Sequence, residues 1–144
     1  MTKPIRISPY NKFKEIEEKL KSKLNINALP IIAESKLSKH SAEWYGHVVI
    51  KLDLEKDEEL IKGYYGFSND KYFYSWEADD SALPKNFELL IKEPIERVAF
   101  LLEIMNDNAV PLRFTVLGGS YHQTERPAHK QATIDTLIDI FNKL

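Results

Sequence analysis

Apolar and polar residues repeat along this chain with two different periods, and the period separates helices from strands. In the first part, apolar residues recur every three or four positions, at Phe13, Ile16, Leu20 and Leu24. That spacing lines one face of an α-helix, and Ser8-Pro9 ahead of it is typical of a helix start. The pattern therefore predicts an amphipathic helix over residues 9–24.

After Glu43 the period changes to two. Every second residue is apolar and would point to the same side, at Val48, Ile50, Leu52 and Leu54. Such alternation predicts a half-buried strand. A short apolar run, Leu29 to Ala33, predicts a further short strand ahead of it, followed by a loop.

An aromatic segment follows an acidic turn at Glu55 to Glu59. Leu60–Ser68 and Lys71–Ala78 are both rich in aromatic residues, and Asn69-Asp70 between them favours a tight turn. We therefore expect a β-hairpin that sets glycines opposite large aromatic side chains. A helix over the first arm is the alternative, but the glycines and aromatic residues count against it.

Prolines divide the segment that follows. Pro84 and Pro94 frame a short predicted helix over residues 86–92. Pro94 also suits the start of a second helix over residues 94–106. That second helix is apolar on nearly every side, which predicts that it is buried in the core.

The last quarter of the chain contains a predicted strand, turn, loop and helix. Apolar residues 112–117 predict the strand, and Gly118-Gly119 predicts a tight turn after it. The polar loop Ser120–Arg126 leads into a helix over residues 126–143. The complete order is α-β-β-β-β-α-α-β-α. This order predicts an α+β fold in one domain, residues 1–144, whose mainly antiparallel sheet carries helices on one face.

Composition narrows the class of protein. With 144 residues, 43% of them hydrophobic and 29% charged, the chain suits one globular domain with a substantial core. It has no cysteine, which excludes disulfides, thiolate metal ligands and a cysteine nucleophile. It also lacks a signal-like or membrane-length apolar run, so we expect a cytoplasmic protein that makes no membrane contact.

Charge is distributed unevenly along the chain. Residues 1–40 carry nine Lys or Arg against four Glu, whereas residues 51–107 carry seven against fourteen Asp or Glu. An acidic middle attracts a basic partner and argues against nucleic-acid binding. Solvated faces with no partner are the alternative interpretation.

The candidate docking residues lie in this acidic middle. They are acidic or aromatic: Asp53, Glu55, Asp57, Glu58, Tyr64, Phe73, Asp79 and Asp80. We expect Tyr64, Phe73 and Tyr45 on an exposed face, because exposed aromatic residues are typical of protein interfaces. A role in the core is the alternative for the aromatic residues, and helix capping is the alternative for Asp79-Asp80.

The loop after Gly118-Gly119 holds the candidate catalytic residues. His122 and His129 would act as general acid or base, because histidine titrates near neutral pH, and Arg126 would hold a carboxylate or phosphate. No phosphate-binding loop, nucleophile elbow or metal-ligand motif accompanies them. An ordinary strand-to-helix turn is therefore the alternative, and we expect no cofactor and no metal.

The charge layout, the aromatic segment and the lack of a catalytic motif together favour a non-enzymatic protein-binding domain. In size, charge and architecture the chain is similar to bacterial immunity or inhibitor proteins, which neutralise a toxin, so the expected partner is a basic protein. The alternative is a small enzyme acting on a phosphorylated or acidic small substrate through His122, Arg126 and His129. A ligand pocket between sheet and helices is a third alternative.

Overall fold

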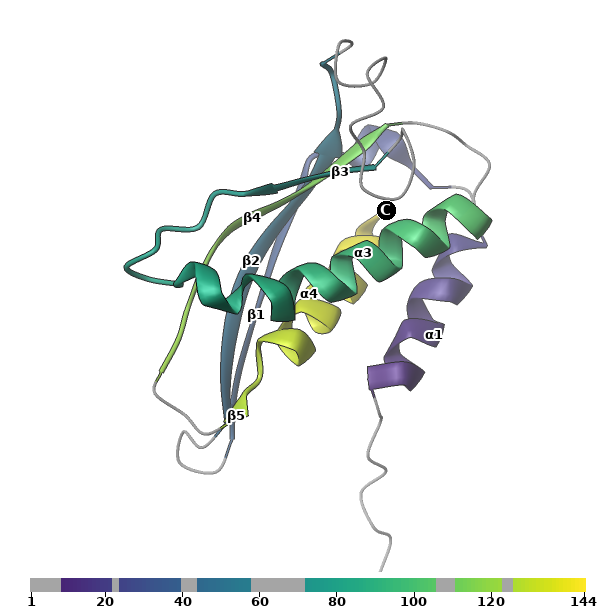
Figure 1. Ribbon diagram of the computed structural model, residues 1–144. Coiled ribbons are helices and arrows are strands. Elements are labelled where there is room, and N and C mark those ends of the chain that lie inside the picture. The colour runs from purple at the N-terminus through teal and green to yellow at the C-terminus, as the bar shows by residue number, and fades with distance from the viewer. Residues whose placement is uncertain (1–8, 22–23, 40–43, 58–71, 106–110, 123–125) are drawn as a thin grey trace, which may run out of the picture.

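The computed structural model describes most of the chain (Figure 1). The described residues are 9–21, 24–39, 44–57, 72–105, 111–122 and 126–144, with backbone alone at 9–13, 39, 105 and 126. Its longer helices are α1 (Pro9–Leu20), α3 (Glu88–Met105) and α4 (His129–Lys143). Its strands are β1 (Ile31–Lys39), β2 (Trp44–Leu54), β3 (Tyr72–Trp76), β4 (Leu112–Ser120) and β5 (Arg126–Pro127).

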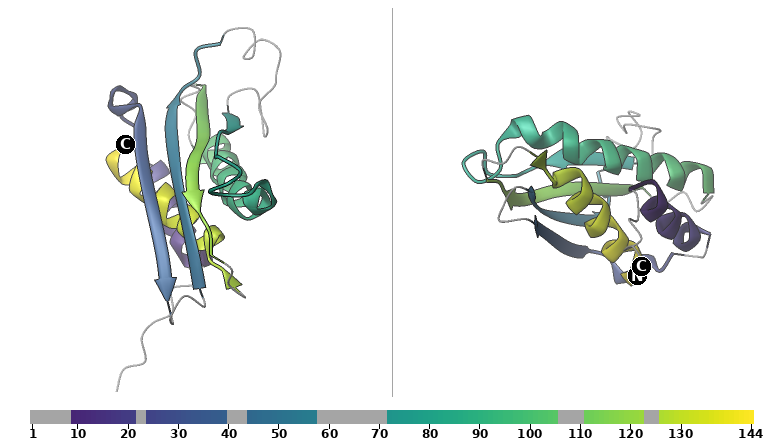
Figure 2. Two further views of the ribbon diagram at one scale, coloured as in Figure 1. Left: turned by 90° about the vertical axis from the view of Figure 1, so that its left-hand side faces the viewer. Right: turned by 90° about the horizontal axis from the view of Figure 1, so that it is seen from below.

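The four longer described strands form one sheet in the order β1-β2-β4-β3. Both β1 and β4 pair with β2 in antiparallel fashion, whereas β3 pairs with β4 in parallel, so the sheet is mixed but mainly antiparallel. The helices α1, α3 and α4 lie on one face of this sheet (Figures 1 and 2). The predicted α+β class, with helices on one face, is confirmed.

The core lies between the sheet and the helices. The even-numbered residues of β2 from Val48 to Leu52 are fully buried, as the period of two predicts. The helices contribute buried apolar residues at helical spacing, namely Ile16 and Leu20 of α1 and Ile134, Leu137 and Phe141 of α4. The opposite side of the sheet is the open face, which carries the odd-numbered residues of β2 and the even-numbered residues of β1.

Helix α3 differs from the prediction in two ways. It is a single helix that passes through Pro94, where the sequence predicts a boundary between two helices. A proline removes its own helical hydrogen bond and crowds the carbonyl of the preceding turn, but buried neighbours such as Ile91 and Ile95 hold the helix on the core. The predicted burial on nearly every side is also wrong, because Phe100 and Ile104 are exposed.

Strand β4 continues through the glycine pair at which the sequence predicts a turn. It runs to Ser120, and neither Gly118 nor Gly119 has a positive φ angle. Gly119 provides space instead, because a Cβ atom there would lie 2.9 Å from a methyl group of Leu83 and closer still to the carbonyl of His47. The β2–β4 register shifts beside Gly118, which makes a β-bulge in β4.

Other element boundaries also differ from the predictions. Strand β1 extends over Ile31–Lys39, so residues expected in a loop after Ala33 belong to a strand. Helix α1 ends at Leu20 and α4 begins at His129, each inside its predicted range. Strand β3 covers part of the second predicted hairpin arm and pairs with β4. The first arm and its turn, residues 60–70, lie outside the described residues.

Candidate functional site

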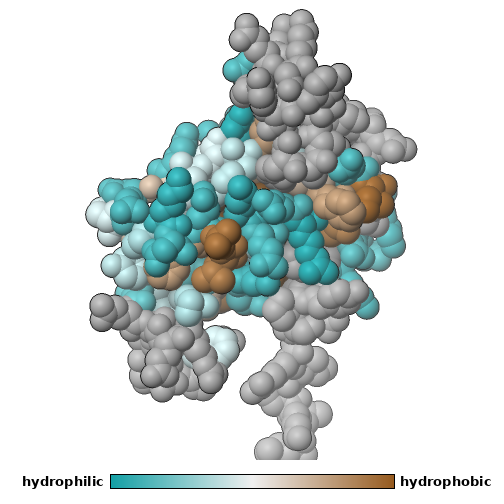
Figure 3. Space-filling view, viewed as in Figure 1, coloured by the Kyte–Doolittle hydropathy of each residue, from teal (hydrophilic) through white to brown (hydrophobic). Residues whose placement is uncertain are grey.

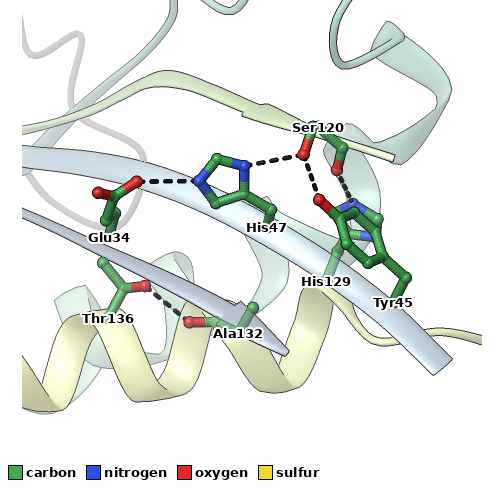
Figure 4. Close-up of polar contacts among 7 residues, drawn as sticks. All are labelled: Glu34, Tyr45, His47, Ser120, His129, Ala132 and Thr136. Atoms are coloured by element: carbon green, nitrogen blue, oxygen red, sulfur yellow. Dashed lines mark hydrogen bonds and ion pairs between the residues drawn. The ribbon is translucent and has the colours of Figure 1, made fainter. Parts of the chain in front are cut away.

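Ser120, at the end of β4, joins neighbouring strands through side-chain hydrogen bonds on the open face (Figure 4). Its Oγ lies 2.9 Å from Nδ1 of His47 and 2.6 Å from the Tyr45 hydroxyl, both on β2. Nε2 of His47 lies 2.9 Å from the carboxylate of Glu34 on β1. We name these four side chains the Ser120 network. It ties β1, β2 and β4 together.

The Glu34 carboxylate fixes the direction of one hydrogen bond in the Ser120 network. The Glu34 carboxylate only accepts, so Nε2–H of His47 donates to it. Oγ of Ser120 bonds Nδ1 of His47 in a direction that the form of the ring sets, and the Ser120 and Tyr45 hydroxyls share a second hydrogen bond in which either can donate. Each of the four side chains therefore has a hydrogen-bond partner within the network, which is the condition for a stable polar network.

A serine, a histidine and a carboxylate in this order can also activate a nucleophile. Two features of the Ser120 network favour a structural role instead. The Tyr45 hydroxyl lies 2.6 Å from Oγ of Ser120, so this oxygen takes part in a further hydrogen bond besides the one with His47. The second feature is packing. Tyr45 is only 3% exposed, and the ring of His122 stacks on it with 3.8 Å between centroids, so this side of the network is covered by protein.

His129, the first residue of α4, is fully buried. Its Nε2–H donates to the backbone carbonyl of Ser120 at 2.9 Å, and its ring packs on Phe87 with 4.6 Å between centroids. Its Nδ1 is buried with no hydrogen-bond partner among the described residues. Burial lowers the pKa of His129 below its ordinary value, so the ring stays neutral near pH 7.

A close backbone contact with β2 brings His129 to this position. The N–H of Ala128 donates to the carbonyl of Tyr45 at 2.8 Å, next to the short β5 pairing. The glycine at 46 allows this approach, because a Cβ atom on Gly46 would lie 2.6 Å from the backbone nitrogen of His129. The local geometry of β2 therefore sets where α4 begins.

The residues predicted for catalysis have different surroundings. His129 is buried with Nε2 engaged by Ser120, whereas His122 is exposed and stacks on Tyr45. The side chain of Arg126 lies outside the described part of the chain. No group of three or more His, Asp or Glu side chains suited to a metal ion occurs among the described residues. Among the described residues, His122 and His129 therefore have no hydrogen-bond partner in common, and they do not form an acid–base pair.

Several predicted docking residues hold the fold together. The side chain of Glu55 is only 8% exposed and forms an ion pair with Arg113 of β4. Asp79 accepts hydrogen bonds from the backbone and hydroxyl of Ser81, and the backbone bond lowers the pKa of this carboxyl. Asp80 accepts a hydrogen bond from the backbone of Lys85, ahead of a short helix. The two aspartates thus bond the backbone of the turn, but neither is the N-cap of the short helix Lys85–Phe87, which is Pro84 and has no side-chain cap bond.

The remaining predicted docking residues are scattered. The expectation that Phe73 and Tyr45 are exposed is wrong, since each is only 3% exposed. The carboxylate of Asp53 accepts a hydrogen bond from the backbone of Leu54. Asp57 is exposed just after β2. Two further predicted residues, Glu58 and Tyr64, lie outside the described residues.

The outer side of α3 exposes a group of apolar side chains that the sequence analysis missed. Leu89, Phe100 and Ile104 are 79%, 54% and 61% exposed. Separations of eleven and four residues place them on one side of the helix. We name these three residues the α3 stripe. Figure 3 shows apolar patches over α3 with hydrophilic surface between them.

Charged side chains separate the two ends of the α3 stripe. Glu93 pairs with Lys130 of α4 at 3.0 Å, and Glu96 pairs with Lys92 at 3.8 Å. Leu89 and three of these charged residues line a shallow surface depression. The charges at 92, 93, 96 and 97 are the sequence signal that this side of the helix faces solvent.

Comparisons with known proteins leave the family open. No family model and no curated protein matches the chain. A crystal structure of a protein from Thermus thermophilus is similar, with a TM-score of 0.43 and 20% identity over 73% of this chain and 14% of that one. The chain thus spans a small part of that protein, and so weak a likeness says nothing about function. No described helix is both long and apolar enough to cross a membrane.

Proposed function

We propose that this protein is a non-enzymatic binding domain that docks on a basic partner protein through the α3 stripe. The observation that carries this proposal is the exposure of Leu89, Phe100 and Ile104 on one side of α3. Covering these three side chains, together with the charged residues between them, with one partner removes apolar surface from water, which is favourable.

The charges of α3 indicate the chemistry of the partner. Along this helix four Glu outnumber Lys92 and Arg97. A surface with apolar anchors surrounded by Lys or Arg would complement it. In its most specific form, the proposal is an inhibitor or immunity-type protein that neutralises a basic toxin in the cytoplasm.

The enzymatic alternative has less support from the described residues. Its proposed base His129 is buried, and Nε2 of that ring is held by the Ser120 carbonyl. His122 is exposed, but its ring stacks on Tyr45. Turnover of a phosphorylated or acidic small substrate that disappears in the His122→Ala variant would favour the enzyme over the docking domain.

The test of docking begins with partners captured by cross-linking from cells of the native source. Each candidate is then purified and titrated calorimetrically against the wild-type protein. We expect one basic protein to bind with a fixed stoichiometry. The combined Leu89→Gln, Phe100→Gln and Ile104→Gln variant should bind it about 100-fold more weakly, because central apolar anchors carry most binding energy.

A matched control separates docking from general loss of apolar surface. Ile26→Gln makes the same kind of change at an exposed residue outside α3, so its affinity should equal that of the wild type. Circular dichroism confirms that each variant is folded. The proposal fails if no basic partner binds, or if the triple variant binds as tightly as the wild type.

A further inference from the structure

Strand β1 forms one edge of the sheet, and no other described strand pairs with its outer side (Figure 2). Its residues pair with β2 from Ile31 to Lys39 without a register shift, so the strand is regular throughout. At every second residue of such an edge, the N–H and C=O groups point away from the sheet. These groups are bonded either by water or by another strand.

Opposite charges flank the centre of β1. Glu34 and Lys36 are both exposed on the open face, one on each side of Ser35. The Glu34 carboxylate contacts His47 through Oε2, yet its side chain remains 66% exposed. A cation approaching from beyond the edge of the sheet can therefore still reach this carboxylate.

We propose that β1 pairs in antiparallel fashion with β1 of a second copy of this chain, about a two-fold axis at Ser35. In this register Glu34 of each copy lies opposite Lys36 of the other, so the junction contains two opposite-charge pairs. On the helix-covered side, Ala33 of each copy lies opposite Leu37 of the other. The two sheets then continue into one.

Charge selects this register and this partner. A slip of two residues moves the axis to Glu34 or Lys36 and sets like charges opposite each other. A slip of one residue brings open-face side chains opposite helix-covered ones. Charged residues on an edge strand repel most other strands. A second β1 is complementary because it carries Lys36 opposite Glu34 and Glu34 opposite Lys36.

The oligomeric state tests the proposal. In analytical ultracentrifugation the wild type should form a concentration-dependent dimer. Lys36→Glu sets two Glu opposite each other, and Glu34→Lys sets two Lys opposite each other. Each change should raise the dimer dissociation constant about tenfold or more. The double variant Glu34→Lys with Lys36→Glu restores both pairs with exchanged charges and should dimerise like the wild type.

Mixing the two single variants separates pairing from misfolding. The Glu34→Lys chain presents two Lys and the Lys36→Glu chain two Glu, so the mixture should form a heterodimer that neither chain forms alone. Lys51→Glu, on the central strand β2, is the control for net charge and should dimerise normally. A wild type that stays monomeric at every concentration overturns the proposal. Single variants that dimerise as strongly as the wild type also overturn it.

Discussion

The described histidines have different environments, and the environment sets what each ring can do. His47 bridges two side chains of the Ser120 network, and His122 stacks on Tyr45 at the surface. His129 is buried at the start of α4 with one nitrogen bonded and the other unpartnered among the described residues. A proton added to His129 would reach a buried nitrogen with no acceptor, which is unfavourable.

The free energy of unfolding should therefore decrease as the pH is lowered. Protonation of His129 in the unfolded chain should account for part of this decrease. Burial lowers the pKa of the folded ring below its ordinary value of 6.5, whereas the unfolded ring titrates near that value. Acid protonates the unfolded chain more readily, so stability present above pH 6.5 is lost as the pH drops below it. Urea unfolding at about pH 8 and about pH 5 measures the difference.

Two variants isolate the contribution of His129. His129→Gln keeps an N–H donor for the Ser120 carbonyl but does not titrate, so its stability should change less between the two pH values. His122→Gln makes the same substitution at an exposed ring and is the matched control. An unchanged pH dependence in His129→Gln would show that the buried ring is not responsible.

The ion pair between Glu55 and Arg113 should contribute to stability, although the sequence assigns Glu55 to docking. Glu55→Ala should lower the unfolding free energy by about 2–4 kcal/mol, because it leaves a partly buried guanidinium without its carboxylate. Glu96→Ala removes only a surface pair with Lys92 and should cost less than about 1 kcal/mol. Equal losses in the two variants, measured by chemical denaturation, would contradict this ranking.

At the scale of the elements, β4 and α3 show how a strong local signal is overridden. Gly118-Gly119 is typical of a turn, yet β4 continues because the contact of Gly119 with His47 needs a residue without a side chain. Pro94 is typical of a helix boundary, yet α3 continues because apolar residues on both sides of it are buried. Packing outweighs the loss of one hydrogen bond.

Glycine substitutions should separate positions where space is required from positions where it is not. Gly46→Ala places a Cβ atom against the backbone of Ala128 and His129, and overpacking of this kind typically costs about 1–3 kcal/mol or more. A Cβ atom on Gly118 meets nothing within 4 Å, so Gly118→Ala should be neutral or slightly stabilising. Thermal unfolding compares them, and equal melting temperatures would refute the spacing argument.

At the scale of the whole molecule, all three longer described helices lie on one face of the sheet, and two surfaces other than its open face are proposed to bind partners. One is the outer side of α3, and the other is the edge of the sheet at β1. The first combines apolar and acidic residues, whereas the second is a backbone edge with alternating charges. They suit partners of different chemistry, so the two proposals stand independently.

Charge on α3 should control how fast the docking partner binds. Glu93→Lys combined with Glu96→Lys should lower the association rate constant about tenfold at low salt, because acidic residues steer a basic partner. Leu89→Gln should instead raise the dissociation rate constant. Stopped-flow measurements over a range of salt concentrations distinguish the two effects. An association rate that does not depend on salt would contradict electrostatic steering.

Sequence alone determined the α+β class, the apolar stripes of α1 and α4, and the alternation of β2. Each of these is local, because burial on one face imposes the period of the helix or strand on nearby residues. The tertiary structure alone decided that α3 is one helix with an exposed outer side and that β3 runs parallel to β4. It also decided the Ser120 network, in which Tyr45 and Ser120 are 75 positions apart. Contacts over such separations depend on how the elements pack, which the period of a single segment does not encode.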